Sequence, residues 1–185
     1  MKKILLFLAE GFEEVEALTV VDYLRRMDIV VDTCSITEEK EVKGAHEIIV
    51  LADKILNEIE GPKDYDGIVI PGGMPGATNL RDEEKVIKLV QEFNHEEKLI
   101  AAICAGPIVL ERAGILEGRE VTSYPGFEGE LKGIYKEELV VQDKNIITAR
   151  GPAVAVYFAL KILENLLDRN RVEDLKKDIL LDMVE

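Results

Sequence analysis

KLIAAICAGPIVLERAG, residues 98–114, combines the two patterns that decide the fold. Its first half, up to Cys104, is almost continuously apolar, which is typical of a strand buried on both faces of a sheet. Its second half predicts a short helix over 107–114, because proline is favoured in a first helical turn and glycine commonly ends a helix. Cys104 therefore lies where a buried strand is followed by a helix.

The same alternation of apolar strands and amphipathic helices recurs along the chain. Strands are predicted at 3–9, 29–36, 47–52, 66–73 and 98–104, and helices at 13–27, 81–97, 107–114, 151–167 and 172–184. A turn of helix is expected near 54–59, short strands at 121–124, 139–143 and 145–149, and a polar break at 168–171. This order predicts an α/β fold with a mostly parallel sheet covered by helices on both faces. Without a repeat or linker, residues 1–185 are expected to form a single domain.

Composition and charge restrict the possible functions. The 185 residues are 47% hydrophobic and 32% charged, as in a soluble globular protein. The net charge of −14 disfavours nucleic acid and anionic membrane surfaces as partners. The apolar run 4–9 is too short for a signal peptide or a membrane span. Two cysteines make no disulfide framework, which predicts a reducing cytoplasm, and neither they nor the two histidines show the spacing of metal ligands.

Two interpretations of Cys104 are open. A free cysteine at the end of a buried strand often packs as a small hydrophobic residue. Cys104 also lies at the carboxyl end of a predicted parallel strand, where open α/β sheets bind ligands. The amides and dipole at the start of helix 107–114 would lower the pKa of the thiol and favour a reactive thiolate. The sharp strand-to-helix turn is similar to the nucleophile elbow of α/β hydrolases, with sulfur as the nucleophile.

Two further stretches follow predicted strands. VIPGGMPGATNL, residues 69–80, places Gly72 and Gly73 after an apolar run, either as an ordinary glycine turn or as a source of free amides for an oxyanion. GFEEVEAL, residues 11–18, places acidic residues in a first helical turn, where they are favourable against the helix dipole. Glu16 has apolar neighbours, so burial would raise its pKa and make it a proton donor or acceptor near the thiol.

Together these stretches resemble the ThiJ/PfpI superfamily and, within it, the subgroup of the human parkinsonism-associated protein deglycase. The resemblance runs from Lys3 to about Leu166 and is carried by LAEGFEEVEA (8–17), the arginine pair 25–26, VIPGGMPGATNL (69–80), LIAAICAGP (99–107) and ITARGP (147–152). It implies a flavodoxin-like three-layer sandwich, usually a homodimer. It also implies a reactive Cys104, a functional Glu16, oxyanion amides at Gly73 and Ala105, and Arg150 near the site.

The chain departs from the family pattern at two places. Peptidase-like members have a histidine directly after the cysteine, where this chain has Ala105. The subgroup often has a second histidine where this chain has Tyr124, whose phenol is a poor base at neutral pH but can hydrogen bond to a substrate. Without a triad histidine, a peptidase or glutamine amidotransferase is not expected. His46 and His95 are expected at the surface, and Cys34 is expected to be a packing residue.

The resemblance and the residues together predict an enzyme that acts on small reactive carbonyls without a cofactor. Its substrates would be aldehydes such as methylglyoxal, converted to lactate by a glyoxalase III-like reaction, or the early glycation adducts of proteins, released by deglycation. The alternative is a redox sensor or stress-protective chaperone whose Cys104 oxidises to a sulfinate. A role in thiazole phosphate or thiamine biosynthesis, an older label of the family, is a third reading. The predicted homodimer would use the helix that carries Arg25 and Arg26, beside Val21 and Leu24.

Overall fold

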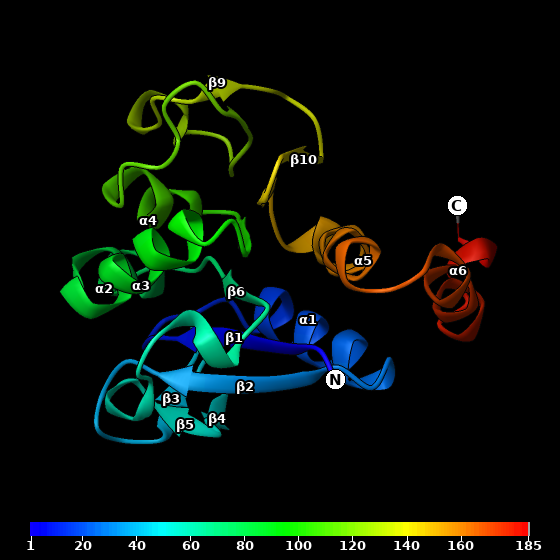
Figure 1. Ribbon diagram of the computed structural model, residues 1–185, viewed down its shortest axis with the longest axis horizontal. Helices are drawn as coiled ribbons and strands as arrows, with labels where there is room; N and C mark the ends of the chain where they lie inside the picture. Colours follow the sequence, from blue (N-terminus) through cyan, green and yellow to red (C-terminus); the bar gives the residue numbers. More distant parts are fainter. Residues whose placement is uncertain (185) are drawn as a thin grey trace.

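The computed structural model describes residues 1–184 and contains one large central sheet (Figure 1). The sheet has seven strands in the order β10-β11-β7-β6-β1-β2-β5. They are β1 (Lys3–Leu8), β2 (Val30–Ser35), β5 (Lys54–Ile55), β6 (Gly67–Ile70), β7 (Leu99–Ile103), β10 (Val140–Asp143) and β11 (Ile146–Ala149). Every neighbouring pair is parallel except β10 and β11, which are antiparallel. The predicted mostly parallel sheet is confirmed.

Helices cover both faces of this sheet, so the fold has three layers. The helices are α1 (Glu14–Arg26), α2 (Gly76–Asp82), α3 (Glu84–His95), α4 (Pro107–Arg112), α5 (Ala155–Leu166) and α6 (Arg169–Asp178). Along β1, Ile4 and Leu6 belong to the core shared with α1, α5 and α6, whereas Leu5 and Phe7 belong to the core shared with α2, α3 and α4. Because both faces of the strand are buried, its sequence is continuously apolar rather than alternating.

The structure differs from the predicted boundaries of three helices. The helix expected over 81–97 begins at Glu84 as α3, because Glu83 is extended and its side chain accepts a hydrogen bond from the amide of Lys85 (3.1 Å). Arg81 and Asp82 instead end α2, which begins at Gly76 in a segment where no helix was expected. The expected polar break 168–171 lies mostly inside α6, which begins at Arg169. Pro152 lies in a 3₁₀ turn, Pro152–Val154, that precedes α5.

Small elements replace three other expected segments. The strand β4 (Ile49–Leu51) pairs with β3 (Glu41–Lys43) in an antiparallel hairpin outside the main sheet, and β8 (Glu120–Val121) pairs with β9 (Ile134–Tyr135). The helical turn expected near 54–59 is β5 followed by a 3₁₀ turn, Leu56–Glu58. The strand expected at 121–124 ends at Val121, because Tyr124 instead donates its amide to the carbonyl of Cys104 (2.9 Å).

The order of the strands places a ligand site at one edge of the sheet. After β1 the chain adds β2 on one side, and later adds β6, β7 and β11 on the other, so the direction of the connections reverses between β1 and β6. Ligands bind at the carboxyl ends of strands beside such a reversal. The segments that follow β1, β6 and β7 meet there, and they contain Glu16, Gly72 and Cys104.

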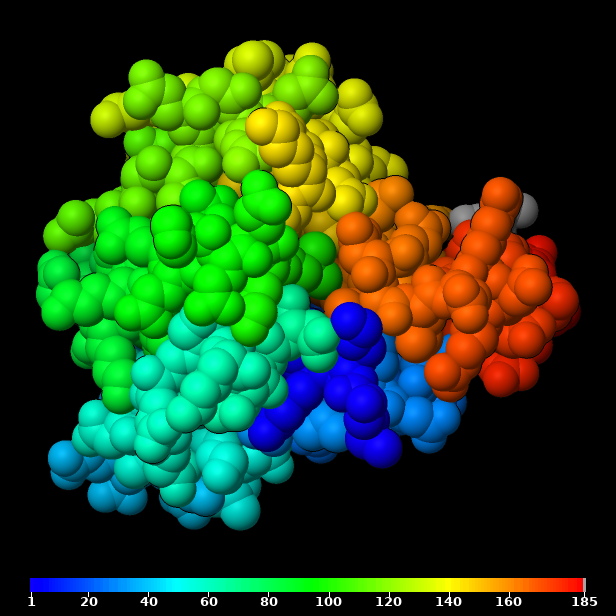
Figure 2. All heavy atoms as spheres, in the orientation of Figure 1, coloured from blue at the N-terminus to red at the C-terminus, as the bar shows by residue number. Residues whose placement is uncertain are grey.

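The last helix extends the layer that contains α1 and α5. In Figure 2, α6 (red) lies beside α5 (orange) at one end of the molecule. Arg171 of α6 donates a hydrogen bond to the carbonyl of Met27 (3.2 Å), just after α1. Within residues 1–184, no helix combines the length and the apolar character that crossing a membrane requires.

Candidate active site

Cys104 lies in a strained turn directly after β7. Its φ of 63° is in the left-handed region, which non-glycine residues adopt rarely and at a cost of about 1–2 kcal/mol. Its amide donates to the carbonyl of Ala149 (2.9 Å), and its carbonyl accepts from the amide of Tyr124 (2.9 Å). Both neighbouring segments therefore hold the turn in place, and the predicted elbow between strand and helix is present.

Glu16, in the first turn of α1, is completely buried beside this cysteine. Its Oε2 accepts a hydrogen bond from the amide of Gly72 (2.8 Å), and within residues 1–184 its Oε1 has no hydrogen bond of ordinary geometry. A Cβ added to Gly72 would lie 2.6 Å from Cβ of Cys104 and 2.7 Å from Oε2 of Glu16. Only glycine at position 72 therefore lets the carboxyl and the cysteine come this close together.

Burial raises the pKa of Glu16 to about 7, and the negative charge of Glu13 acts in the same direction. Hydrogen bonds from the Cys104 thiol and the Gly72 amide oppose this rise without cancelling it. The raised pKa expected from the apolar neighbours of Glu16 is confirmed. At neutral pH this carboxyl is therefore poised both to accept and to donate a proton.

The expected lowering of the thiol pKa is wrong. Burial, followed by the charge and the hydrogen bond of Glu16, raises the pKa of Cys104 to about 12. The amides of Ala105 and Gly73 lower it, but α4 is only six residues long and the carboxylate is adjacent. Because the pKa of Glu16 lies well below that of Cys104, the carboxyl ionises first, so the sulfur keeps its proton and has a base beside it instead of being a free thiolate.

The amides of Gly72 and Gly73, both expected to bind an oxyanion, have different partners in the structure. The amides of Gly73 and Ala105 both face the sulfur of Cys104, where they are placed to hold an oxyanion formed next to it. The prediction that the Gly72 amide binds the oxyanion is wrong, because this amide donates to Glu16. Gly73 has a φ of 86°, and a Cβ there would overlap the amide nitrogen of Glu13.

Tyr124 and Arg150 lie at the periphery of the site. The side chain of Tyr124 is half exposed, and a Cβ added to Gly151 would lie 3.1 Å from its ring. Because its backbone is bonded to Cys104, Tyr124 is held on the side of the site nearest β11. Arg150 follows β11, and its guanidinium donates to the carbonyl of Glu137 (3.1 Å). Substrate contact by either residue stays a prediction.

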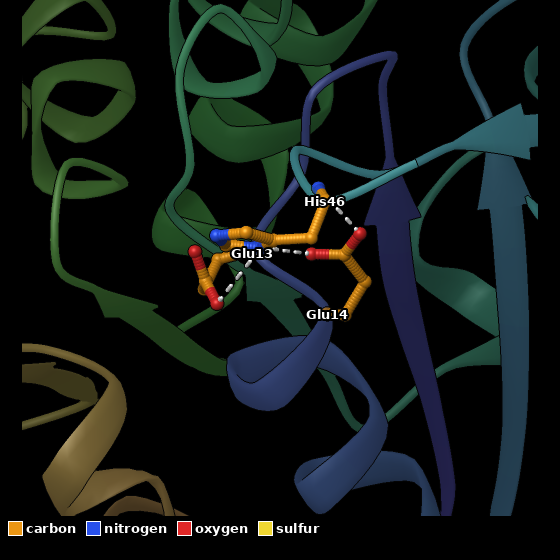
Figure 3. A group of neighbouring side chains, drawn as sticks. All are labelled: Glu13, Glu14 and His46. Atoms are coloured by element: carbon orange, nitrogen blue, oxygen red, sulfur yellow. Dashed lines mark hydrogen bonds and ion pairs between the residues drawn. The ribbon is translucent and has the colours of Figure 1, made fainter. Parts of the chain in front are cut away.

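One group of interacting side chains near the site was not predicted from the sequence. His46 donates its amide to Oε1 of Glu14 (2.8 Å), and its Nδ1 lies 2.9 Å from Oε2 of Glu14 and 3.7 Å from Oε1 of Glu13 (Figure 3). His46 is exposed, as expected, but it is not isolated. Because both oxygens of Glu14 already accept hydrogen bonds from His46, this cluster is an ion-pair contact rather than a metal site.

The second cysteine is not part of the site. Cys34, on β2, is completely buried and donates to the carbonyl of Ser35 (3.6 Å). Burial raises its pKa to about 12, so it is an unreactive packing residue, as the sequence indicates. Cys104 is only partly buried.

Comparison with known proteins relates this site to a family. The family model described as DJ-1/PfpI matches residues 2–165. Protein dj-1beta of Drosophila melanogaster is 36% identical over 183 residues, which cover 97% of each chain. The glutathione-independent glyoxalase DJ-1 of Schizosaccharomyces pombe is 32% identical over 189 residues, covering 97% of this chain and 98% of that protein. The structure of oxidized Toxoplasma gondii DJ-1 superposes with a TM-score of 0.93 at 35% identity, over 97% of this chain and 98% of that one. The chain belongs to the DJ-1/PfpI family.

Proposed function

We propose that the protein is a cysteine-dependent enzyme that converts small reactive aldehydes to hydroxy acids, with methylglyoxal and lactate as the leading pair. The observation that carries this proposal is the buried Glu16 carboxyl, with its pKa near neutrality, beside the Cys104 thiol in a strained turn. The similarity to the glyoxalase of Schizosaccharomyces pombe supports the same reaction class. Deglycation of early glycation adducts would use the same groups and is the related activity.

The first step is the addition of sulfur to the aldehyde carbon. The Glu16 carboxylate takes the thiol proton as the bond between sulfur and carbon forms, because it already accepts a hydrogen bond from Cys104. The aldehyde oxygen becomes an oxyanion, which the amides of Gly73 and Ala105 stabilise. Glu16 returns the proton to this oxygen, and the product is a hemithioacetal.

The second step moves a proton between two carbon atoms of the substrate. Glu16 removes the hydrogen from the carbon bonded to sulfur, and the electron pair forms an enediol as the ketone oxygen takes up a proton. A proton is then delivered to the former ketone carbon while the hydroxyl on the first carbon loses its proton. The first carbon is thereby oxidised to a thioester and the second is reduced to an alcohol, so no external oxidant, reductant or cofactor is consumed. Water then breaks the bond between carbon and sulfur, which releases lactate and restores the thiol.

This proposal is tested by incubating the protein with methylglyoxal and measuring lactate. Cys104→Ala is expected to reduce lactate formation to the uncatalysed rate, because the other cysteine, Cys34, is completely buried on β2. Cys34→Ala is the matched control and is expected to retain the activity of the unmodified protein. Equal turnover by Cys104→Ala and the unmodified protein would refute the proposal.

A redox-sensing or stress-protective function is the second candidate. It is favoured by the partial exposure of Cys104 beside a carboxyl donor and by the similarity to the oxidized Toxoplasma gondii protein. The thiol would be oxidised by peroxide to a sulfinate, held by Glu16 and the neighbouring amides. Mass spectrometry after mild peroxide treatment is expected to place the added oxygens on Cys104. Oxidation mainly at Cys34 would contradict this function.

A further inference from the structure

The segment that carries His46 is fixed against the start of α1. The amide of Gly11 donates to the carbonyl of Lys43 (2.8 Å), and the amide of Ala45 donates to the carbonyl of Phe12 (2.8 Å). A Cβ added to Gly44 would overlap the carboxyl group of Glu14. The contact between His46 and α1 is therefore maintained by the three residues that directly precede His46.

This contact faces two acidic side chains that are mostly buried. Glu14 is 4% exposed, and both of its oxygens accept hydrogen bonds from groups of His46. Burial opposes ionisation of Glu14, but these hydrogen bonds hold its pKa below the ordinary value. The side chain of Glu13 is only 15% exposed, and within residues 1–184 the one cationic group near it is His46, at 3.7 Å.

Glu13 is connected to the catalytic pair through the glycine turn. Its amide donates to the carbonyl of Gly72 (3.0 Å), and the amide of Gly72 donates to Glu16 (2.8 Å). The charge of Glu13 acts on Glu16 and disfavours its ionisation. The charged groups that face His46 are Glu13 and Glu14, while the nearby Lys43 is paired with Glu47 (3.3 Å).

We propose that His46 is a positioning residue of this site: as an imidazolium it offsets the charge of Glu13 and so sets the pH at which Glu16 accepts the proton of Cys104. This inference rests on the proposed role of Cys104 and Glu16, but not on the identity of the substrate. The hydrogen bond to Glu14, and then the charge of Glu13, raise the pKa of His46 above its usual 6.5, so the imidazolium persists toward neutral pH. When it loses its proton, the charge of Glu13 is uncompensated and Glu16 ionises less readily.

The direction of the effect follows from the charge at position 46. His46→Gln keeps a hydrogen-bond donor for Glu14 but is never charged, so the transition at Glu16 should move to higher pH. His46→Arg keeps a cation at every pH, so the transition should move to lower pH. The expected shift in each direction is about half a pH unit, or about a threefold change in rate below the midpoint, as for a partly exposed ion pair.

The test is the rate of Cys104 alkylation by iodoacetamide between pH 5.5 and pH 9, with the alkylated cysteine identified by mass spectrometry. His95→Gln is the matched control, because His95 is exposed at the end of α3, and it should leave the midpoint unchanged. In a Glu13→Gln background, His46→Gln should no longer shift the midpoint. Circular dichroism on each variant establishes that the fold is retained.

Three results would overturn the inference. An unchanged midpoint in both His46→Gln and His46→Arg would overturn it and leave the proposed function intact. An equal shift in the Glu13→Gln background would show that the effect does not pass through Glu13. A wild-type profile without any midpoint near neutral pH would instead overturn the proposed pairing of Cys104 with Glu16, and the proposed function with it.

Discussion

At the scale of single residues, the site is built from groups held in unfavourable states. Cys104 has a backbone conformation that costs about 1–2 kcal/mol, and Glu16 is a carboxyl without exposure to water. Such costs persist only where the surrounding structure enforces them, and they cluster at functional sites. Replacing these residues should therefore change stability and activity in opposite directions.

The first prediction is that Glu16→Gln stabilises the protein at high pH. The pKa of Glu16 rises from 4.5 to about 7 on folding, so the folded state resists ionisation. The resulting loss in the free energy of unfolding is absent below pH 4.5, grows as the pH rises from 4.5 to about 7, and is constant above that. Glutamine carries no charge, so the variant should gain up to about 3 kcal/mol at pH 8 and almost nothing at pH 4. Urea unfolding at the two pH values measures this, and an equal gain at both would contradict it.

The same substitution should remove activity. Glutamine cannot accept the thiol proton, so turnover of methylglyoxal by Glu16→Gln is expected to fall by about 10²- to 10⁴-fold. The rise in kcat/KM with pH near 7 should also disappear, because Glu16 is the group that titrates there. A variant that is more stable but retains this inflection would show that another group is the base.

The residues of the site were predictable to different degrees. Cys104 and Glu16 could be found because each follows a buried strand, and parallel strands end at one edge of the sheet. The pKa of the thiol could not be predicted, because it depends on how deeply the carboxyl and sulfur are buried together. His46 contacts a glutamate 32 positions away through an irregular segment, and no periodic pattern in the sequence indicates such a contact.

At the scale of elements, the turn between β6 and α2 holds the site together. Gly72 has no side chain and so allows Glu16 and Cys104 to approach each other. Gly73 turns the chain so that its amide faces the sulfur. Each glycine is packed against backbone or side-chain atoms that a methyl group would displace. The geometry of this turn is therefore less tolerant of substitution than that of the surface turns.

A comparison of two glycines tests this. Both Gly73 and Gly118 have positive φ, 86° and 72°, but a Cβ at Gly73 would overlap the amide of Glu13, whereas nothing lies within 4 Å of one at Gly118. Gly118→Ala should cost about 1 kcal/mol of stability from backbone strain alone. Gly73→Ala should cost more than that and also reduce alkylation of Cys104. Equal midpoints of urea unfolding for the two variants would contradict the prediction.

The long elements were predictable and the short ones were not. Buried strands are continuous apolar runs, and amphipathic helices of ten or more residues carry a clear hydrophobic period. The division between α2 and α3 depends on a single capping side chain, Glu83, inside a continuous amphipathic pattern. The hairpin β3–β4 has three-residue strands, and on β4 both Ile49 and Leu51 are exposed, so no alternation indicates which face is buried.

At the scale of the whole molecule, this hairpin displays an apolar edge. Ile49 and Leu51 are 61% and 70% exposed. The interface expected beside Val21 and Leu24 is wrong, because both side chains are buried in the core of the chain. Arg25 and Arg26 form ion pairs within the chain, with Asp53 (2.7 Å) and Asp22 (2.8 Å). The homodimer implied by the family resemblance remains a prediction, and we propose that β4 contributes to its interface.

Sedimentation velocity tests the homodimer. The unmodified protein is expected to sediment as a dimer, and Leu51→Glu is expected to shift it toward the monomer, because a charge would be buried in the interface. Leu180→Glu is the matched control, since Leu180 is 61% exposed after α6, far along the chain from β4. A monomeric unmodified protein would remove the homodimer prediction.

Because Cys34 is buried, a thiol titration of the native protein counts only the reactive Cys104 side chains. A chromogenic disulfide reagent should release one equivalent of its coloured leaving group from each native chain, at Cys104, and two equivalents after denaturation in guanidinium. The equivalents released per native chain give the fraction of chains whose Cys104 is reactive, and the denatured reading checks the total thiol content. The rate of turnover of any candidate aldehyde can then be expressed per chain with a reactive Cys104, even before the physiological substrate is known.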